Sequence, residues 1–217
     1  MLVSVSDKIG ARSGALDRRR SGGTGGVDAA RRIAEEGAVA QSVLEGNRDH
    51  FRHLVTRYQG SLISTLYRLV QSREEAEELA QQTFVDAFDA LARFDQSRRF
   101  STWLFRIGIN NAKDWLKSSK RGERQLDGCV AADGAAFAGR MTAPDRAAEA
   151  SEQRDRLRGA LGELKLEFRE VIVLKDIQGL SYDEIHEVLG YPITTLKIRA
   201  VRGRAALREL LERESER

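Results

Sequence analysis

The sequence has few residues that bind metals or form disulfides, with one cysteine and three histidines among its 217 residues. Cys129 has no partner for an internal disulfide, and a cluster of cysteine and histidine ligands is excluded. His50 and His53 lie three residues apart, but no third ligand accompanies them. We therefore expect no metal and no cofactor, and we interpret Cys129 as a bystander rather than a redox switch.

Proline, aromatic residues and long hydrophobic runs are also scarce. Two prolines and an aromatic content of 6% argue against a β-sandwich or barrel, which needs more turn residues and more strand-forming side chains. No apolar run approaches the ~20 residues of a membrane span. The arginines at 18–20 precede a glycine-rich stretch rather than an apolar segment, so they are not an export signal. These absences predict a cytoplasmic protein without membrane insertion.

Composition and helical periodicity divide the chain into four parts. Residues 1–37 are rich in glycine and arginine, which predicts a disordered extension. Residues 38–119 carry apolar side chains at helical spacing and can form a small helical bundle. Residues 120–152 are an acidic, glycine-interrupted linker that becomes helical again from about Asp145, and 153–217 are a second helical unit. The predicted fold is all-α, with two small helical domains joined by a flexible linker.

A helix-turn-helix is predicted in the second unit. Ser181 and Glu184 form a capping box at the start of a short helix, and Gly190 ends that helix. A longer helix follows at 193–212, as a helix-turn-helix requires. Positions 191–208 hold five basic residues and no acid, so positive charge lies on the helix expected to enter a major groove.

The helix predicted at 73–94 has two opposite faces. One face is an apolar stripe that would pack in the core, and the other is polar except for one valine. A solvated acidic face explains the polar residues, whereas Val85 favours a docking surface for a protein partner. The residues of this outer face are Glu74, Glu78, Gln81, Gln82, Val85 and Asp89.

The segment 96–121 combines seven basic residues with four aromatic ones and a single acid. Cations suit the phosphates of a nucleic-acid strand, and aromatic rings can stack on unpaired bases. For Trp103 core packing is the favoured alternative, whereas for the basic side chains we favour contact with nucleic acid. A reader of duplex DNA and a reader of single strands in one chain indicate a protein that recognises two spaced DNA elements and opens one of them.

At these residues the chain resembles the extracytoplasmic-function sigma factors of bacterial RNA polymerase, a branch of the sigma-70 family. Residues 74–88 (EEAEELAQQTFVDAF) resemble the family's core-binding region. Residues 100–117 (FSTWLFRIGINNAKDWLK) resemble its −10 recognition region, and 179–207 (GLSYDEIHEVLGYPITTLKIRAVRGRAAL) resemble its −35 helix-turn-helix. The resemblance covers roughly 42–119 and 153–213, about two thirds of the chain.

The resemblance implies a transcription initiation factor that performs no catalysis itself. Region 2, at 38–119, would bind the clamp of core RNA polymerase and would melt and read the −10 element. Region 4, at 153–217, would bind the flap and read the −35 element. The implied partners are core polymerase, promoter DNA as duplex and as melted strand, and an anti-sigma factor.

The residue pattern and the resemblance together predict DNA contacts for particular side chains. The predicted −10 contacts are Arg98, Arg99, Phe100, Trp103, Arg106, Asn110, Lys113 and Lys117. The predicted −35 contacts are Thr194, Thr195, Lys197, Ile198, Arg199 and Arg202.

Two other classes of protein compete with this interpretation. A helix-turn-helix regulator that binds duplex DNA without polymerase leaves the outer face of 73–94 and the segment 96–121 unexplained. An enzyme is disfavoured because no histidine accompanies a nucleophile and no phosphate-binding glycine loop precedes a helix.

Overall fold

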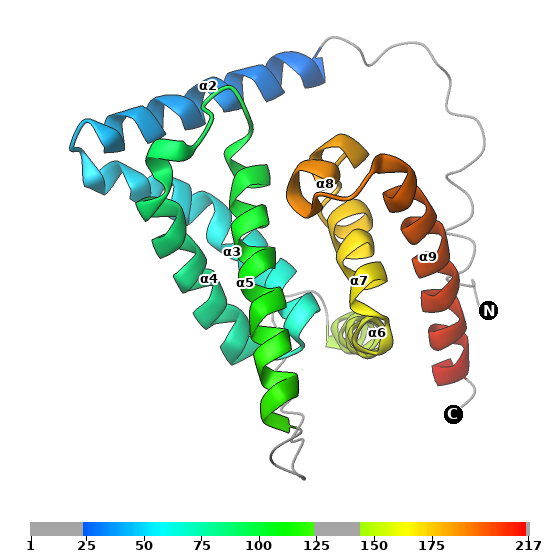
Figure 1. Ribbon diagram of the computed structural model, residues 1–217. Helices are drawn as coiled ribbons and strands as arrows, with labels where there is room; N and C mark the ends of the chain where they lie inside the picture. Colours follow the sequence, from blue (N-terminus) through cyan, green and yellow to red (C-terminus); the bar gives the residue numbers. More distant parts are fainter. Residues whose placement is uncertain (1–23, 124–143, 216–217) are drawn as a thin grey trace. The chain divides into compact units, whose positions relative to one another are not determined.

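All the long regular elements of the chain are helices in a computed structural model that describes residues 24–123 and 144–215 (Figure 1). No strand occurs within these two ranges, which confirms the predicted all-α fold for them. The remaining residues lie outside the described part; they include Cys129, much of the predicted extension 1–37 and most of the predicted linker 120–152.

The first helical domain is built from three long helices that pack on one another, preceded by a fourth (Figure 1). These helices are α2 (Thr24–Leu44), α3 (Phe51–Val70), α4 (Arg73–Asp89) and α5 (Phe100–Glu123), with 3-10 turns at Arg48–His50 and Leu91–Arg93. Their core contains Leu62, Leu66, Phe100 and Leu104, which are all fully buried. Burial of each such side chain stabilises the fold by about 1.5–3 kcal/mol, so this core holds α3 and α5 against each other.

In this domain, the start of the first helix and the end of α4 differ from the positions predicted from the sequence. Residues 24–37 are helical rather than part of a disordered extension, and Glu36 and Ala40 are buried, which gives α2 a packing face. The helix predicted at 73–94 ends earlier, at Asp89. The backbone then turns through Leu91–Arg93, and this turn brings the Phe94 ring into the core.

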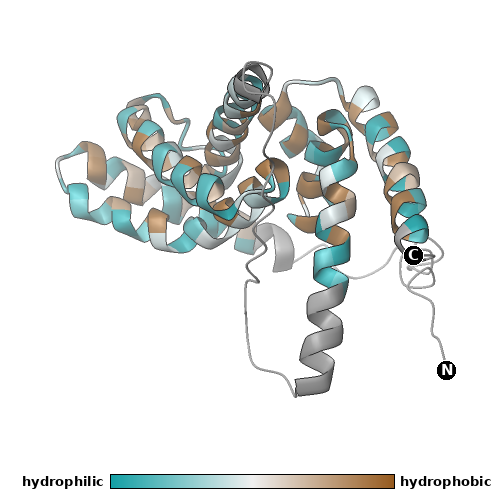
Figure 2. Cartoon of the chain, turned by 90° about the horizontal axis from the view of Figure 1, so that it is seen from below, coloured by the Kyte–Doolittle hydropathy of each residue, from teal (hydrophilic) through white to brown (hydrophobic). Residues whose placement is uncertain are grey.

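The second helical domain contains the predicted helix-turn-helix. Its elements are α6 (Pro144–Glu163), α7 (Leu166–Ile172), the π-helical segment Val173–Ile177, α8 (Tyr182–Leu189) and α9 (Ile193–Ser215). The start of α6 agrees with the helix expected from about Asp145. Figure 2 shows hydrophobic and hydrophilic residues alternating along the helices, as amphipathic packing requires.

Both ends of α8 have the predicted local chemistry. The Glu184 amide donates to Ser181 Oγ (3.2 Å), and the Ser181 amide donates to Glu184 Oε2 (2.7 Å), which completes the capping box. Gly190 adopts a left-handed conformation (φ 76°), and its N–H donates to the His186 carbonyl at 2.8 Å. Glycine adopts this conformation without the steric cost of a side chain, so it ends α8 and sets the direction of α9.

The two helical domains belong to one compact unit, Ile33–Arg217, and they touch through specific elements. Helix α5 contacts α8, and α3 contacts α6 and α7. The buried guanidinium of Arg169 donates to the Leu69 carbonyl (2.6 Å) of the first domain and to the Leu164 carbonyl (2.9 Å) of the second. Burial lowers the pKa of Arg169, so these carbonyls stabilise a cation that has lost its water.

We expect Gly108→Val to destabilise the first domain. A Cβ atom at Gly108 would lie 2.9 Å from Leu62 Cδ1 and 3.3 Å from Thr83 Oγ1, and both neighbours are fully buried. Overpacking of this kind costs about 1–3 kcal/mol. Gly60→Val in α3 is the matched control, because nothing lies within 4 Å of its Cβ position. Urea unfolding followed by circular dichroism should show a lower midpoint for Gly108→Val only; equal midpoints would refute the close contact of α5 with α3.

Candidate nucleic-acid and protein interfaces

The outer face of α4 is formed as the sequence predicts. Ser72 caps the helix by accepting a hydrogen bond from the Glu75 amide (3.4 Å), and the stripe that includes Ala76, Ala80 and Ala87 is buried. The opposite side is therefore turned outward. All six predicted residues are exposed on it: Glu74, Glu78, Gln81, Gln82, Val85 and Asp89. Val85 is 53% exposed among these polar side chains.

The loop before α5 holds Arg98 and Arg99 in a fixed geometry. Asp95 Oδ1 accepts hydrogen bonds from the Ser97 amide (3.0 Å) and hydroxyl (2.6 Å), and its Oδ2 lies 3.2 Å from Arg98 Nε. The hydrogen bonds from Ser97, assisted by Arg98, lower the pKa of Asp95. The Arg99 carbonyl accepts the Trp103 amide (3.4 Å), so α5 starts directly after this loop.

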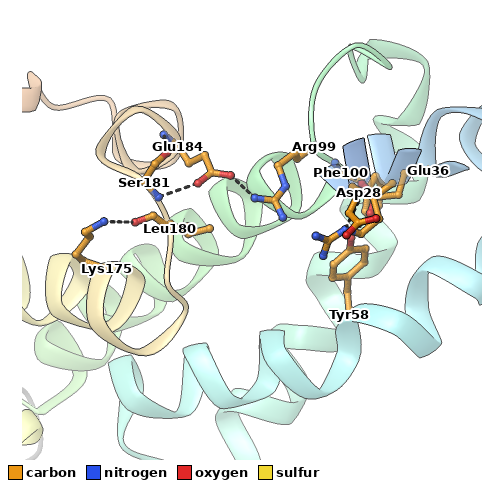
Figure 3. A network of polar contacts seen from close by, with 10 residues as sticks. Asp28, Glu36, Tyr58, Arg99, Phe100, Lys175, Leu180, Ser181 and Glu184 are labelled. Carbon is orange, nitrogen blue, oxygen red and sulfur yellow. Dashed lines mark hydrogen bonds and ion pairs between the residues drawn. The ribbon is translucent and has the colours of Figure 1, made fainter. Parts of the chain in front are cut away.

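Both arginines of this loop pair with acids of α8. Arg98 Nη1 lies 2.9 Å from Glu187 Oε1. Arg99 Nη1 lies 2.5 Å from Glu184 Oε1 (Figure 3). Burial alone would raise the pKa of Glu184, but hydrogen bonds from Ser181 and Arg99 bring it below its usual value. Glu184 therefore serves two purposes, because the same carboxylate also completes the capping box.

Two of the predicted −10 residues lie in the core rather than on a DNA face. Phe100 is fully buried, and its ring packs edge-to-face on Phe94 (5.4 Å between centroids) and Phe51 (6.4 Å). Trp103 is half-buried beside the same rings, 5.2 Å from Phe94 and 5.6 Å from Phe100. The core alternative for Trp103 is thus supported. The prediction for Phe100 is wrong in this structure, because a ring without exposed surface cannot meet a base.

The remaining −10 residues follow one side of α5. Arg106 and Asn110 are exposed, and Lys117 is exposed beside Asp114, at 2.9 Å. Lys113 is different, because its Nζ pairs at 2.7 Å with Glu170, a carboxylate of α7 that is 1% exposed. Burial raises the pKa of Glu170, and the nearby cation offsets part of that effect.

Arg199 belongs to the same buried cluster rather than to the outer face of α9. It is 17% exposed, pairs with Glu167 (3.1 Å), and lies 3.7 Å from Glu170. Its guanidinium also stacks over the Tyr191 ring, 4.0 Å from the centroid. Arg199 therefore does not lie on the exposed surface, where the predicted phosphate contact would have to form. Helical position alone placed it at the edge of that surface, and tertiary pairing turned it inward.

The outward row of α9 contains the other predicted −35 residues. Thr194, Lys197, Ile198 and Arg202 are exposed, and Thr195 is half-buried. Ile198 is 52% exposed, and Val201, which the sequence did not single out, is 66% exposed beside it. Leu196 and Ala200 are fully buried on the opposite side and fix the rotation of the helix. The row therefore offers two cations and two apolar side chains to a partner.

Asp176 holds α9 against the π-helical segment. Its carboxylate accepts two hydrogen bonds from Arg204, at 2.6 and 2.9 Å. Hydrogen bonding to this carboxylate raises the pKa of Arg204. Bidentate pairs of this kind fix orientation as well as position, so Arg204 is a structural residue of the recognition helix.

Within residues 24–123 and 144–215, no helix has an apolar stretch of the length that a membrane span requires. Among these residues, no group of three or more histidine, cysteine, aspartate and glutamate side chains could hold a metal ion.

Family models and known proteins match the same two helical domains. Residues 54–122 match the model of Sigma-70 region 2, and 154–207 match that of Sigma-70, region 4. The chain is 35% identical to the ECF RNA polymerase sigma factor SigW of Bacillus subtilis, over 79% of this chain and 94% of that protein. It is 32% identical to the RNA polymerase sigma-H factor of Pseudomonas aeruginosa, over 80% of this chain and 92% of that one.

Two solved structures have a similar fold. CnrH in complex with the cytosolic domain of CnrY has a TM-score of 0.59 at 31% identity, covering 85% of this chain and 98% of that one. The sigma factor RpoE of Bartonella quintana, in complex with the anti-sigma factor NepR, has a TM-score of 0.64 at 25% identity, covering 75% and 96%. The identities and the coverage place this chain in the extracytoplasmic-function branch of the sigma-70 family.

Proposed function

We propose that the chain is a dissociable transcription initiation factor that binds core RNA polymerase and directs it to promoters with spaced −10 and −35 elements. The observation that carries this proposal is the presence, on one chain, of an exposed, mostly polar face on α4 and two separate basic helices, α5 and α9. Catalysis belongs to the polymerase, and the chain itself is not an enzyme. It acts in the cytoplasm, where promoter DNA and core polymerase are found.

The melted strand of the −10 element would bind to the loop before α5 and to α5 itself. Arg98, Arg99, Arg106 and Lys117 would meet phosphates, and Asn110 would lie close to a base. Arg98 and Arg99 are paired with acids of α8 in this structure. A DNA strand would compete with those carboxylates, because phosphate and carboxylate oxygens use the same guanidinium donors.

The outward row of α9 would enter the major groove of the −35 element. Lys197 would anchor a phosphate, Arg202 would pair with a guanine edge, and Ile198 would touch a thymine methyl. Val201 adds a second exposed apolar side chain next to Arg202. The loss of Arg199 from this row leaves Arg202 as the long cation best placed to read a base.

We expect Arg202→Ala and Lys197→Ala to differ in kind. Arg202→Ala should relax preference at one upstream base pair, since a bidentate contact to guanine is worth about 1–3 kcal/mol of discrimination. Lys197→Ala should weaken all promoters about equally, because a phosphate contact carries no sequence information. A promoter-library selection with each variant measures both effects. A uniform loss for Arg202→Ala would make it a phosphate clamp and refute its assigned role.

Protein partners are proposed for two of these surfaces. We propose that the α4 face binds the clamp of core polymerase and that region 4 binds the flap. An anti-sigma factor is proposed as a further partner, supported by the likeness to the Bartonella quintana sigma factor bound to NepR.

A band-shift experiment separates this function from that of a polymerase-independent regulator. A labelled promoter duplex is incubated with the chain alone, with core polymerase alone, and with both. The proposal predicts a sequence-specific complex only when both are present. Tight, specific binding by the chain alone would favour the regulator and contradict the proposal.

A further inference from the structure

A buried carboxylate from α2 holds the start of α5. Glu36 is 3% exposed, and its Oε2 accepts a hydrogen bond from the Phe100 amide at 3.0 Å. Its Oε1 accepts a hydrogen bond from the Tyr58 hydroxyl of α3 (Figure 3). One side chain therefore joins three helices, and it does so at the residue that begins α5.

The chemistry of this contact suits the fixing of a helix end. The first N–H groups of a helix have no partner within the helix, and the helix dipole favours negative charge there. A buried carboxylate is costly unless hydrogen bonds satisfy it, so Glu36 is stable here only with α5 and Tyr58 in place. Burial raises the pKa of Tyr58, and the hydrogen bond to Glu36 raises it further, so Tyr58 remains a donor.

Helix α2 also touches the loop that carries Arg98 and Arg99. Gly37 lies so close to Gln96 that a Cβ atom would be 3.3 Å from both the Cβ and the carbonyl oxygen of Gln96. Gln96 Nε2 in turn donates to Gln41 Oε1 at 3.0 Å. Contacts from α2 thus reach both ends of the segment between Gln96 and Phe100, and Arg98 and Arg99 lie between them.

We infer that Glu36 is a positioning residue for promoter melting, which fixes the arginine loop so that it can capture the displaced DNA strand. The inference rests on the proposed −10 role of Arg98 and Arg99. Glu36 does not touch DNA in this account; it acts through the start of α5 and through the loop before it. Its contribution would be preorganisation, because a loop already held in place loses less freedom when the strand binds.

The test measures strand capture by the reconstituted holoenzyme. The probe is a labelled single-stranded oligonucleotide that carries the −10 sequence of the most active promoter from a library transcription. Glu36→Ala should weaken its binding about tenfold, because it leaves the Phe100 amide and the half-buried Tyr58 hydroxyl without their acceptor. Affinity for core polymerase should be unchanged. Glu36→Gln should retain most of the binding, since its amide can accept from Phe100 and donate to the Tyr58 oxygen.

Two comparisons separate positioning from general destabilisation. Glu35→Ala is the matched control, because Glu35 is its exposed neighbour, 3.9 Å from Arg57, and should leave capture unchanged. In an Arg98→Ala/Arg99→Ala background, Glu36→Ala should have almost no additional effect on the oligonucleotide. A further loss of the same size in that background, or wild-type capture by Glu36→Ala alone, would overturn the inference. If Arg98→Ala/Arg99→Ala itself leaves capture intact, the proposed −10 site fails instead.

Discussion

Arg98→Ala/Arg99→Ala should lower the rate of open-complex formation roughly 10- to 100-fold, because two charge-assisted contacts to the non-template strand are lost. Binding of the closed complex should change less, since the proposed duplex contacts lie in α9 and in core polymerase. The salt slope of strand binding should fall by about 0.7 for each phosphate contact removed. Permanganate reactivity of unpaired thymines in the −10 element measures the melted fraction directly.

The control for this variant uses the acid that pairs with Arg98. Glu187→Gln removes the partner at 2.9 Å but leaves both arginines in place. If the arginines act on DNA, Glu187→Gln should melt the promoter at least as well as the wild type, because one fewer carboxylate competes with the DNA strand for Arg98. A permanganate footprint of wild-type strength from Arg98→Ala/Arg99→Ala would contradict the assignment. A loss of melting with Glu187→Gln would show that the ion pair itself matters.

Glu78→Lys combined with Gln81→Ala should weaken binding to core polymerase tenfold or more, as expected when a charge at a protein interface is reversed. Both residues are exposed on the outer face of α4, and neither packs in the core. Helix content should therefore stay unchanged by circular dichroism. Competition against a labelled wild-type chain for a limited amount of core polymerase gives the relative affinity.

Glu77→Lys is the control for this second variant. It introduces the same reversal of charge on the same helix, but Glu77 lies off the outer face and pairs with Arg73 at 2.8 Å. Its affinity for core polymerase should stay within about twofold of the wild type, since exposed pairs of this type contribute little. If both variants bind core polymerase as the wild type does, the α4 face is not the docking surface.

Features set by neighbouring residues could be predicted from the sequence. The capping box of Ser181 and Glu184 and the stop at Gly190 depend on contacts within a few residues, and they form as expected. The outer face of α4 follows from helical periodicity, because a buried stripe forces the opposite side outward. These local rules were sufficient to predict the all-α fold and the helix-turn-helix.

Features set by contacts between distant segments could not be predicted in this way. Phe100 stands beside basic residues in the sequence, yet the rings of Phe51 and Tyr58 on α3 and of Phe94 pack against it. Arg199 is turned inward by acids more than 25 positions earlier in the chain. Glu36 lies 64 positions before the amide that it holds, within a stretch whose composition suggested disorder. No periodicity within a helix signals such pairings.

In vitro transcription with purified core polymerase over a randomised promoter library measures promoter selection by the chain directly. The proposed function predicts chain-dependent transcripts, whose promoters share two conserved elements at a fixed spacing. It also predicts that the spacing tolerates little change, because both DNA-binding helices must engage one polymerase at once. Transcripts that are independent of the chain, or that share only one element, would contradict it.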